Sequence, residues 1–321
     1  MLSSMKHQLN KLHPEKISFR GTTSTRSIPL ILPWVLFTAG LGAPKAVACA
    51  SCGSGGGDPL ILYPNEDLKF YFSLGHQKVE KEVSAASKRD DVYGPKQKTN
   101  ALLSLGLRLH YDLFTTFTTG LQFNQREGHK GQGVVDPSLL FRYTIVNQTF
   151  EKPWYPQIQG VLGYKHAQGT SIHSSKEPDL VDVTSSGYSD IKIGFDVWYG
   201  MHDIRGGIAY LRLISLPRKE SDGSKNENGL THRWTATLGY QLSAMFKVTG
   251  GLNRQTTEAR RYQGSLVDDS EIQDHSAFVN LDFMGYESQS VRLGYVQSAL
   301  LPTDRLTTQT QSMTLAFLFS L

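Results

Sequence analysis

Two cysteines, Cys49 and Cys52, form a Cys-x-x-Cys pattern just after a run of small residues. A zinc site would need two further ligands close by, and a thioredoxin-like redox site would need a surrounding βαβ unit; neither accompanies the pair. In an exported chain we expect the two thiols to form a local disulfide. Lipidation of Cys49 is the alternative, because Ala-Val-Ala-Cys is similar to a lipoprotein cleavage site, although the usual Leu three residues before the cysteine is missing. We expect no metal here.

The other residues that could do chemistry are charged side chains, which recur at alternate positions of otherwise apolar segments. Alternate side chains of a β-strand point to the same face, so these charges share one face of their strands. If that face lines the interior of a barrel, it forms a polar wall with a modest excess of positive charge. The residues that we expect to line this interior are Lys69, Arg108, Asp136, Arg142, Lys165, Asp190, Lys192, Asp196, Arg233, Lys247, Asp274, Asp282 and Arg292.

Signals for catalysis are poor. The sequence has no His-Glu-x-x-His or Gly-x-Ser-x-Gly motif and no glycine loop of the kind that binds phosphate. A membrane-embedded lipase would need Ser, His and an acid or amide positioned together, but His110 and His275 fall on opposite faces of their strands. No basic block with interleaved aromatics favours nucleic acid. We therefore expect neither an enzyme nor a cofactor, and a membrane-bound hydrolase is the weakest alternative.

The N-terminal region has the order of a secretory signal peptide. A basic region is followed by an apolar run over 28–41, and Ala46-Val47-Ala48 then offers a small-residue cleavage site. The apolar run is too short and too broken by proline to anchor the chain in a bilayer. The predicted division of the chain is a signal peptide over 1–48, a Cys- and Gly-rich periplasmic segment over 49–65 and a barrel over 66–321.

Apolar and polar residues alternate with a period of two in the rest of the chain, which is typical of strands with two unlike faces. In the clearest run, Ile193 and Phe195 alternate with Lys192 and Asp196. Five of these runs extend over nine to eleven residues, the length that a tilted strand needs to cross the hydrocarbon layer. In the run near 204–214 the alternation leaves open which face is polar. The twelve predicted strands cover 68–74, 103–111, 117–123, 139–145, 158–164, 190–199, 204–214, 234–242, 246–252, 277–283, 291–295 and 313–321.

The predicted connections alternate between long and short, as they do in outer-membrane barrels. With twelve strands, both termini then lie on the short-turn, periplasmic side. A soluble β-sandwich also has one polar face per strand, but strand length, loop alternation, the signal peptide and tyrosines near strand ends together favour a membrane barrel. The long connections are predicted near 76–98, 126–133, 167–187, 216–229, 255–272 and 301–309, and the tyrosines are Tyr111, Tyr143, Tyr164, Tyr199, Tyr240 and Tyr295.

Two segments share the pattern Gly-x-x-Asp, Gly133 to Asp136 and Gly187 to Asp190, each expected at the start of a strand. These strand starts resemble those of the phenol-degradation-pathway (MetA-pathway) family of outer-membrane transporter-like β-barrels. The ending Phe317-Leu-Phe-Ser-Leu321 also resembles the C-terminal signal of outer-membrane barrels, with Leu where Phe is typical. The resemblance is diffuse over the mature chain. It implies a barrel that passes small solutes and implies no catalytic residue.

Three carboxylates are predicted to form part of a ring near the external opening: Asp136, Asp190 and Asp274. Asp136 lies six residues from Arg142, roughly 20 Å along a strand, and so is too far away to pair with it. Asp190 and Lys192 are same-face neighbours within reach of each other. Because cations outnumber acids on this face, we expect these carboxylates to be neutralised and to support the wall, instead of acting as a selectivity filter.

The sequence therefore predicts an all-β protein, a transmembrane antiparallel up-and-down barrel of about twelve strands in the outer membrane. The predicted function is a channel or transporter-like passage for small solutes. A closed barrel with a structural or surface-interaction role is the alternative, because barrels of about eight strands are filled while those of sixteen or more leave a channel. The predicted partners are outer-membrane lipid and, through the C-terminal strand, the barrel-assembly machinery.

Overall fold

The computed structural model describes residues 66–83, 96–149, 151–172, 174–219, 225–267, 270–285, 288–299, 301 and 307–321. The predicted signal peptide, the segment over 49–65 and the Cys49–Cys52 pair lie outside these residues, so those assignments stay predictions. Within the described part, no helix is long and apolar enough to cross a membrane.

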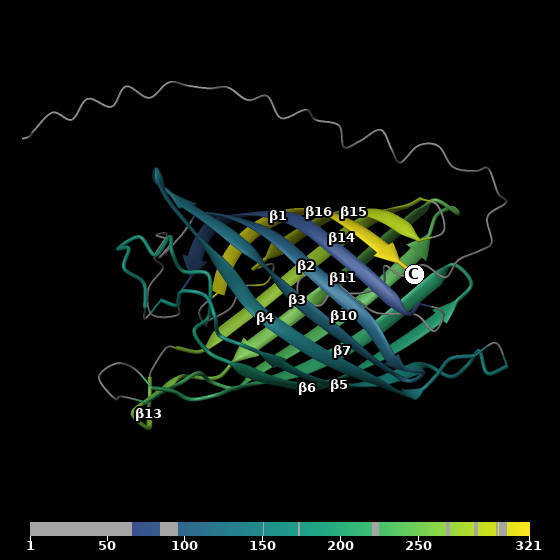
Figure 1. Cartoon of the computed structure of the whole chain (residues 1–321), viewed down its shortest axis with the longest axis horizontal. Helices are drawn as coiled ribbons and strands as arrows, with labels where there is room; N and C mark the ends of the chain where they lie inside the picture. Colours follow the sequence, from purple (N-terminus) through teal and green to yellow (C-terminus); the bar gives the residue numbers. More distant parts are fainter. Residues whose placement is uncertain are drawn as a thin grey trace, which may run out of the picture. The chain divides into compact units, whose positions relative to one another are not determined.

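Twelve long strands make a closed barrel, which confirms the predicted fold class and strand number. They follow one another around the barrel in chain order, each antiparallel to the next (Figure 1). The strands are β1 (Leu68–Val83), β2 (Gln97–His110), β3 (Leu113–Arg126), β4 (His129–Val146), β5 (Gln157–Lys165), β6 (Asp190–Met201), β7 (Ile204–Ser215), β10 (Thr231–Gln241), β11 (Phe246–Thr257), β14 (Ile272–Met284), β15 (Gln289–Ser298) and β16 (Thr307–Ser320).

The barrel closes between its first and last strands. β1 pairs with β16 in antiparallel register, with Phe70 opposite Phe319. Beyond the paired residues, the backbone N–H of Leu321 donates to the carbonyl of Leu68 at 2.8 Å. A closed sheet leaves no row of unpaired N–H and C=O groups at an edge, which is the condition for a β-structure in a nonpolar solvent. The first and last described residues therefore lie at one end of the barrel, called here the terminal end; the opposite end is the distal end (Figure 1).

The outer surface of the barrel is apolar because one residue in two points outward. On β6, Ile193 and Phe195 are 47% and 39% exposed, whereas Asp196 and Trp198 are buried. Rings of Phe195, Tyr210 and Trp234 pack together on this surface, with 4.5 Å between the centroids of the last two. Other exposed apolar side chains include Phe70, Phe72, Leu74, Leu103, Leu107, Phe117, Leu121, Leu162, Leu238, Leu252, Val279, Leu281, Leu293 and Phe317.

The structure decides the orientation of β7, where the alternation of the sequence was ambiguous. Leu211 is 8% exposed and Ile208 is 52% exposed, so Leu211 points inward and Ile208 points outward. The ambiguity arose because both faces of this strand carry large apolar residues.

One predicted long connection, 126–133, is wrong. β3 and β4 continue through most of it and are joined by Glu127 and Gly128 alone. Both residues have positive φ, 47° and 93°, as a tight hairpin turn of this kind requires, and glycine adopts that conformation without steric cost. At this exposed tip the Lys96 ammonium, 2.8 Å from the Glu127 carboxylate, donates a hydrogen bond that holds the pKa of Glu127 below its ordinary value.

Two other predicted connections contain short strands at the distal end (Figure 1). β8 (Arg218–Lys219) and β9 (Lys225–Glu227) precede β10, and β12 (Arg261–Tyr262) and β13 (Ser265–Leu266) precede β14. Together they form a separate four-stranded sheet in the order β13-β12-β9-β8. The loops after β7 and β11 are therefore ordered against each other by backbone pairing.

Candidate functional site: the interior of the barrel

The interior of the barrel is the candidate site, because the side chains of the inward-facing residues meet there. The charged residues predicted to line it are placed by the structure with little exposure. Lys69, Arg142, Asp190, Lys192, Asp196, Lys247, Asp282 and Arg292 are each buried, and the side chains of Arg108, Asp136 and Lys165 are 13%, 7% and 17% exposed. Arg233 and Asp274 are partly buried.

Ion pairs occupy the terminal end of the interior. The Nε atom of Arg142 on β4 lies 3.0 Å from the carboxylate of Asp196 on β6, and the Arg142 guanidinium lies over the ring of Phe114 at 5.8 Å. Across the barrel, Arg292 Nε lies 2.6 Å from Asp282 Oδ1 and its Nη2 lies 3.3 Å from Oδ2. This two-point geometry fixes the guanidinium in the plane of the carboxylate.

Asp282 also faces a second cation. In the registers of β14 with its two neighbours, Asp282 lies opposite Arg292 on β15 and opposite Lys247 on β11. All three side chains are buried, and Asp282 has no exposed surface. One carboxylate thus lies between two cations in the wall of the barrel.

A second charged cluster lies toward the distal end. The Lys165 ammonium is 2.7 Å from a carboxylate oxygen of Asp190 and 3.6 Å from one of Asp136. Asp190 also accepts a hydrogen bond from the hydroxyl of Ser215 at 2.7 Å. Asp136 accepts backbone N–H groups from the connection that follows β5. The two carboxylates of the repeated Gly-x-x-Asp pattern therefore share one lysine.

Asp190 has a partner on the neighbouring strand, Lys165, in addition to having Lys192 as its same-face neighbour. Lys165 is directly opposite Asp190 in the β5–β6 register, and opposed side chains of adjacent strands start about 5 Å apart. Lys192 is two residues along the same strand, about 6.6 Å away at strand rise. The residue across the sheet is thus closer than the same-face neighbour on the strand.

One part of the prediction for the mouth carboxylates is wrong, namely the placement of Asp136 at the start of a strand. Asp136 does not start a strand, because β4 begins at His129; the two strands shift register beside it, between Thr118 and Gly120 of β3. Asp274 is on β14, six strands away from β4 in either direction around the barrel. Asp136 and Asp190 therefore form one cluster, and Asp274 lies on the opposite wall.

The interior also has an apolar part. It was not predicted from the sequence, because only the charged residues of the inward faces were considered there. Leu140, Val161 and Leu211 form a buried cluster with Leu213 packed against it, and Phe278 is buried on another wall. These side chains lie on the same inward faces as the charges. The interior is therefore polar at its ends and partly apolar between them.

Large inward side chains lie flat across the wall because glycines face them. Trp198 is directly opposite Gly207, and a Cβ built on Gly207 would lie 2.3 Å from the indole. The same arrangement pairs Phe278 with Gly251 at 2.4 Å. A side chain that covers the backbone of the next strand extends along the wall instead of toward the axis. The other pairs are Leu102 with Gly120, Leu140 with Gly163 and Leu211 with Gly194.

Gly207→Ala is expected to move the Trp198 indole off the wall and into the interior, because the new methyl group would overlap it. If the barrel conducts, its single-channel conductance in a planar bilayer falls. Gly206→Ala is the matched control, since the nearest atoms to its built Cβ are 3.4 Å and 3.5 Å away and it faces outward. Equal conductance in the two variants would contradict the flat placement of Trp198.

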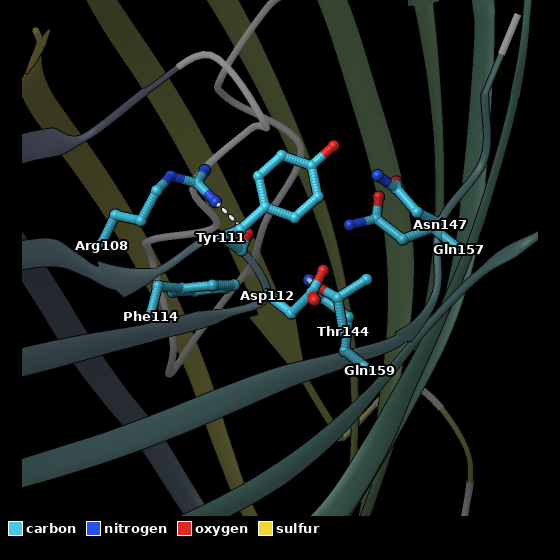
Figure 2. Close-up of a pocket in the computed structure, with 8 residues that line it drawn as sticks. All are labelled: Arg108, Tyr111, Asp112, Phe114, Thr144, Asn147, Gln157 and Gln159. Carbon is cyan, nitrogen blue, oxygen red and sulfur yellow. Dashed lines mark hydrogen bonds between the residues drawn. The ribbon is translucent and has the colours of Figure 1, made fainter.

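A small polar pocket opens at the terminal end. Figure 2 shows the Tyr111 ring between Arg108 on one side and the amides of Asn147 and Gln157 on the other. The Arg108 guanidinium donates to the carbonyl of Tyr111 at 2.8 Å and to the carbonyl of Glu66 at 3.0 Å. These two hydrogen bonds fix the Arg108 guanidinium at the rim of the pocket. The remaining lining residues are Asp112, Phe114, Thr144 and Gln159.

Among the described residues, no group of three or more His, Cys, Asp or Glu side chains is arranged to hold a metal ion. The described inward side chains present fixed charges, amides, hydroxyls and apolar surface.

Comparison with known proteins shows the fold. No protein-family model matches the sequence, and no curated protein matches it. Among solved structures, the COG4313 outer membrane channel from Pseudomonas putida F1 matches with a TM-score of 0.63 at 10% sequence identity, over 81% of this chain and 97% of that chain. A porin structure, NanC, matches with a TM-score of 0.49 at 8% identity, over 78% of this chain and 100% of that chain. The chain has the all-β, closed-barrel fold of an outer-membrane channel.

Proposed function

We propose that this protein is an outer-membrane channel that passes small solutes by diffusion or facilitated transport. The observation that carries the proposal is the contrast between the two surfaces of one closed barrel. The outer surface is apolar around its circumference, which suits a bilayer. The inner surface collects buried charges that are largely held in ion pairs, and large apolar side chains that lie along the wall.

The charges of this inner wall favour a mild preference for anions. The thirteen predicted lining residues comprise eight cations and five carboxylates, an excess of three positive charges. Because at least Arg142, Lys165 and Arg292 are ion-paired, the field at the axis is weaker than the excess alone would produce. We therefore expect weak selectivity instead of exclusion of one sign.

We further propose that the terminal end faces the periplasm and that the C-terminal strand is recognised by the barrel-assembly machinery. The ending Phe-Leu-Phe-Ser-Leu supports this, as does the greater length of most connections at the distal end, since external loops of such barrels are the long ones. Kinship with the phenol-degradation-pathway barrels is part of the same proposal. It is supported by Gly187 and Asp190, where the aspartate does begin a strand.

The test is conductance of the purified, refolded protein in a planar bilayer, together with entry of uncharged sugars into vesicles that carry it. We expect stepwise ion currents and sugar-dependent swelling. A folded barrel that passes neither ions nor sugars would overturn the proposal.

A filled barrel with a structural or surface role is the alternative. The observation that favours it is the complete burial of Lys69 and Asp282, which shows that the terminal end is tightly packed along part of the wall. The same measurement separates the two functions, because a filled barrel is silent in both assays.

A further inference from the structure

The connection between β5 and β6 is folded against the barrel instead of extending from it. In Figure 1 it lies at the distal end, beside the long β3–β4 hairpin. The described part of this connection, residues 166–172 and 174–189, is called here the docked loop. Its Val181, Ser171 and Tyr188 are only 1%, 1% and 3% exposed. The burial of these three side chains shows that the connection packs against other parts of the protein.

The docked loop is held on the inner face of β3. Asn124, which is 2% exposed, donates through its side-chain amide to the carbonyls of Val181 at 2.9 Å and Val183 at 2.7 Å. Gln122 donates to the Val183 carbonyl at 3.3 Å. Asn124 and Gln122 alternate with the exposed Phe123 and Leu121. The loop therefore lies on the side of the wall opposite to the apolar outer surface.

Two glycines of β4 make room for this docking. Gly131 is opposite Asn124 in the register and Gly133 is opposite Gln122, so both face inward as well. A Cβ built on Gly131 would lie 2.3 Å from the carbonyl oxygen of Val181, and one on Gly133 would lie 2.6 Å from the hydroxyl of Thr184. The loop backbone thus contacts the strand backbone directly. Any side chain at Gly131 would have to displace it.

Further anchors extend the docked loop across the ends of the strands that it joins. Its Thr184 hydroxyl donates to the carbonyl of Val134 on β4 at 3.1 Å. On the other side, the guanidinium of Arg218, which follows β7, donates to the Ser171 hydroxyl at 2.7 Å. The contacts thus run from β3 and β4 to Arg218 of β8, with the ends of β5 and β6 between them. A segment held on the inner face over this span occupies part of the distal opening.

We infer that the docked loop is a constriction of the channel and that its docking on Asn124 and Gly131 sets the upper size of the solutes that pass. This inference rests on the proposed channel function. The solutes that pass the constriction are small. Larger ones are excluded sterically at the distal opening.

Two variants release the loop by different means. Gly131→Ala places a methyl group where the Val181 carbonyl lies, and Asn124→Leu removes both donated hydrogen bonds at nearly constant side-chain volume. Gly75→Ala is the matched control: this glycine also faces inward, on β1, and its built Cβ would be 3.5 Å from the nearest atom. Each variant is first checked for folding by its faster migration unheated than boiled on a detergent gel.

The readout is vesicle swelling in arabinose, sucrose and raffinose, with single-channel conductance in KCl. Both loop variants are expected to admit raffinose severalfold faster than the wild-type protein and to show higher conductance, whereas Gly75→Ala behaves as wild type. A wild-type protein that conducts, with an unchanged sugar limit in both folded loop variants, would overturn the inference but leave the channel function standing. If wild type and variants are all silent, both proposals fail.

A labelling experiment reports docking without any current. In a background lacking Cys49 and Cys52, Val181→Cys is expected to react slowly with a maleimide, because this position is 1% exposed. Adding Gly131→Ala is expected to accelerate the reaction severalfold. Fast labelling without the second substitution shows that the loop is not docked and contradicts the inference. Faster labelling in the double variant without any change in the sugar limit contradicts the constriction.

Discussion

Asp282→Asn is expected to lower the free energy of unfolding by about 3–5 kcal/mol, the cost of removing one partner from a buried ion pair. The substitution preserves shape but removes the charge that Arg292 contacts at two points, at 2.6 Å and 3.3 Å. It also leaves Arg292 and Lys247, both buried, on either side of a neutral amide. The measurement is urea-induced unfolding of the refolded protein in vesicles, followed by tryptophan fluorescence.

A double-mutant comparison identifies the cause. Arg292→Met alone leaves Asp282 facing one cation fewer, so it too is expected to destabilise the barrel. When Asp282→Asn and Arg292→Met are combined in one chain, the loss should be clearly smaller than the sum of the two single losses, since neither charge then remains without the other. Additive losses would show that Asp282 and Arg292 contribute separately, through other contacts, and that the ion pair is not the source of the stability.

Phe195→Arg is expected to destabilise the barrel by about 2–4 kcal/mol, the cost of an arginine on the lipid face of a membrane barrel near the midplane. Phe195 lies in the middle of β6 and points outward, 39% exposed. Its ring packs against Tyr210 and Trp234, with centroids 5.7 Å and 6.3 Å away, and the substitution removes these contacts as well. The same urea titration in vesicles measures the effect.

Lys192→Arg is the matched control for this experiment, because it introduces the same side chain on the same strand but on the inner face, where a cation is already present. It should change stability little. If Phe195→Arg is tolerated as well as Lys192→Arg, then the outer surface of β6 does not face lipid.

The interior pairs also explain why the wall can be charged and stable together. A buried charge is costly unless it is paired and hydrogen-bonded. The Arg292–Asp282 pair joins the neighbouring strands β15 and β14, and the Arg142–Asp196 pair joins the next neighbours β4 and β6. Pairing within the wall keeps both side chains close to it. For a channel, this arrangement means that neutralising one partner changes stability more than it changes selectivity.

The alternation of apolar and polar residues predicted the strand number and the assignment of Phe195 outward and Asp196 inward. Together with strand length, the signal peptide, the loop pattern and the tyrosines near strand ends, it also predicted the closed barrel. The assignment of faces is possible because successive side chains of a strand point to opposite faces. Once one side chain is assigned to the lipid-facing or the inward face, the faces of the other side chains of that strand follow. The positions of the turns could not be predicted in the same way, because a run of polar residues can be either a connection or the end of a strand. A long connection was predicted at 126–133, where Gly128 allows a two-residue turn and the polar residues belong to strands that continue past the apolar surface.

Only the tertiary structure decided which inward residues meet. The partner of a residue depends on the register between strands, and the register shift in β3 opposite β4 changes which residues of β4 face inward. The β5–β6 register places Lys165 against Asp190, and Asp136 on β4 reaches the same lysine from the other side. The docking of the loop on Asn124 and Gly131 could likewise not be predicted from the sequence. In the sequence, a glycine that makes room for a loop looks the same as any other glycine in a strand. Strand periodicity fixes the face of a side chain, whereas pairing and loop docking depend on contacts between segments far apart in the chain.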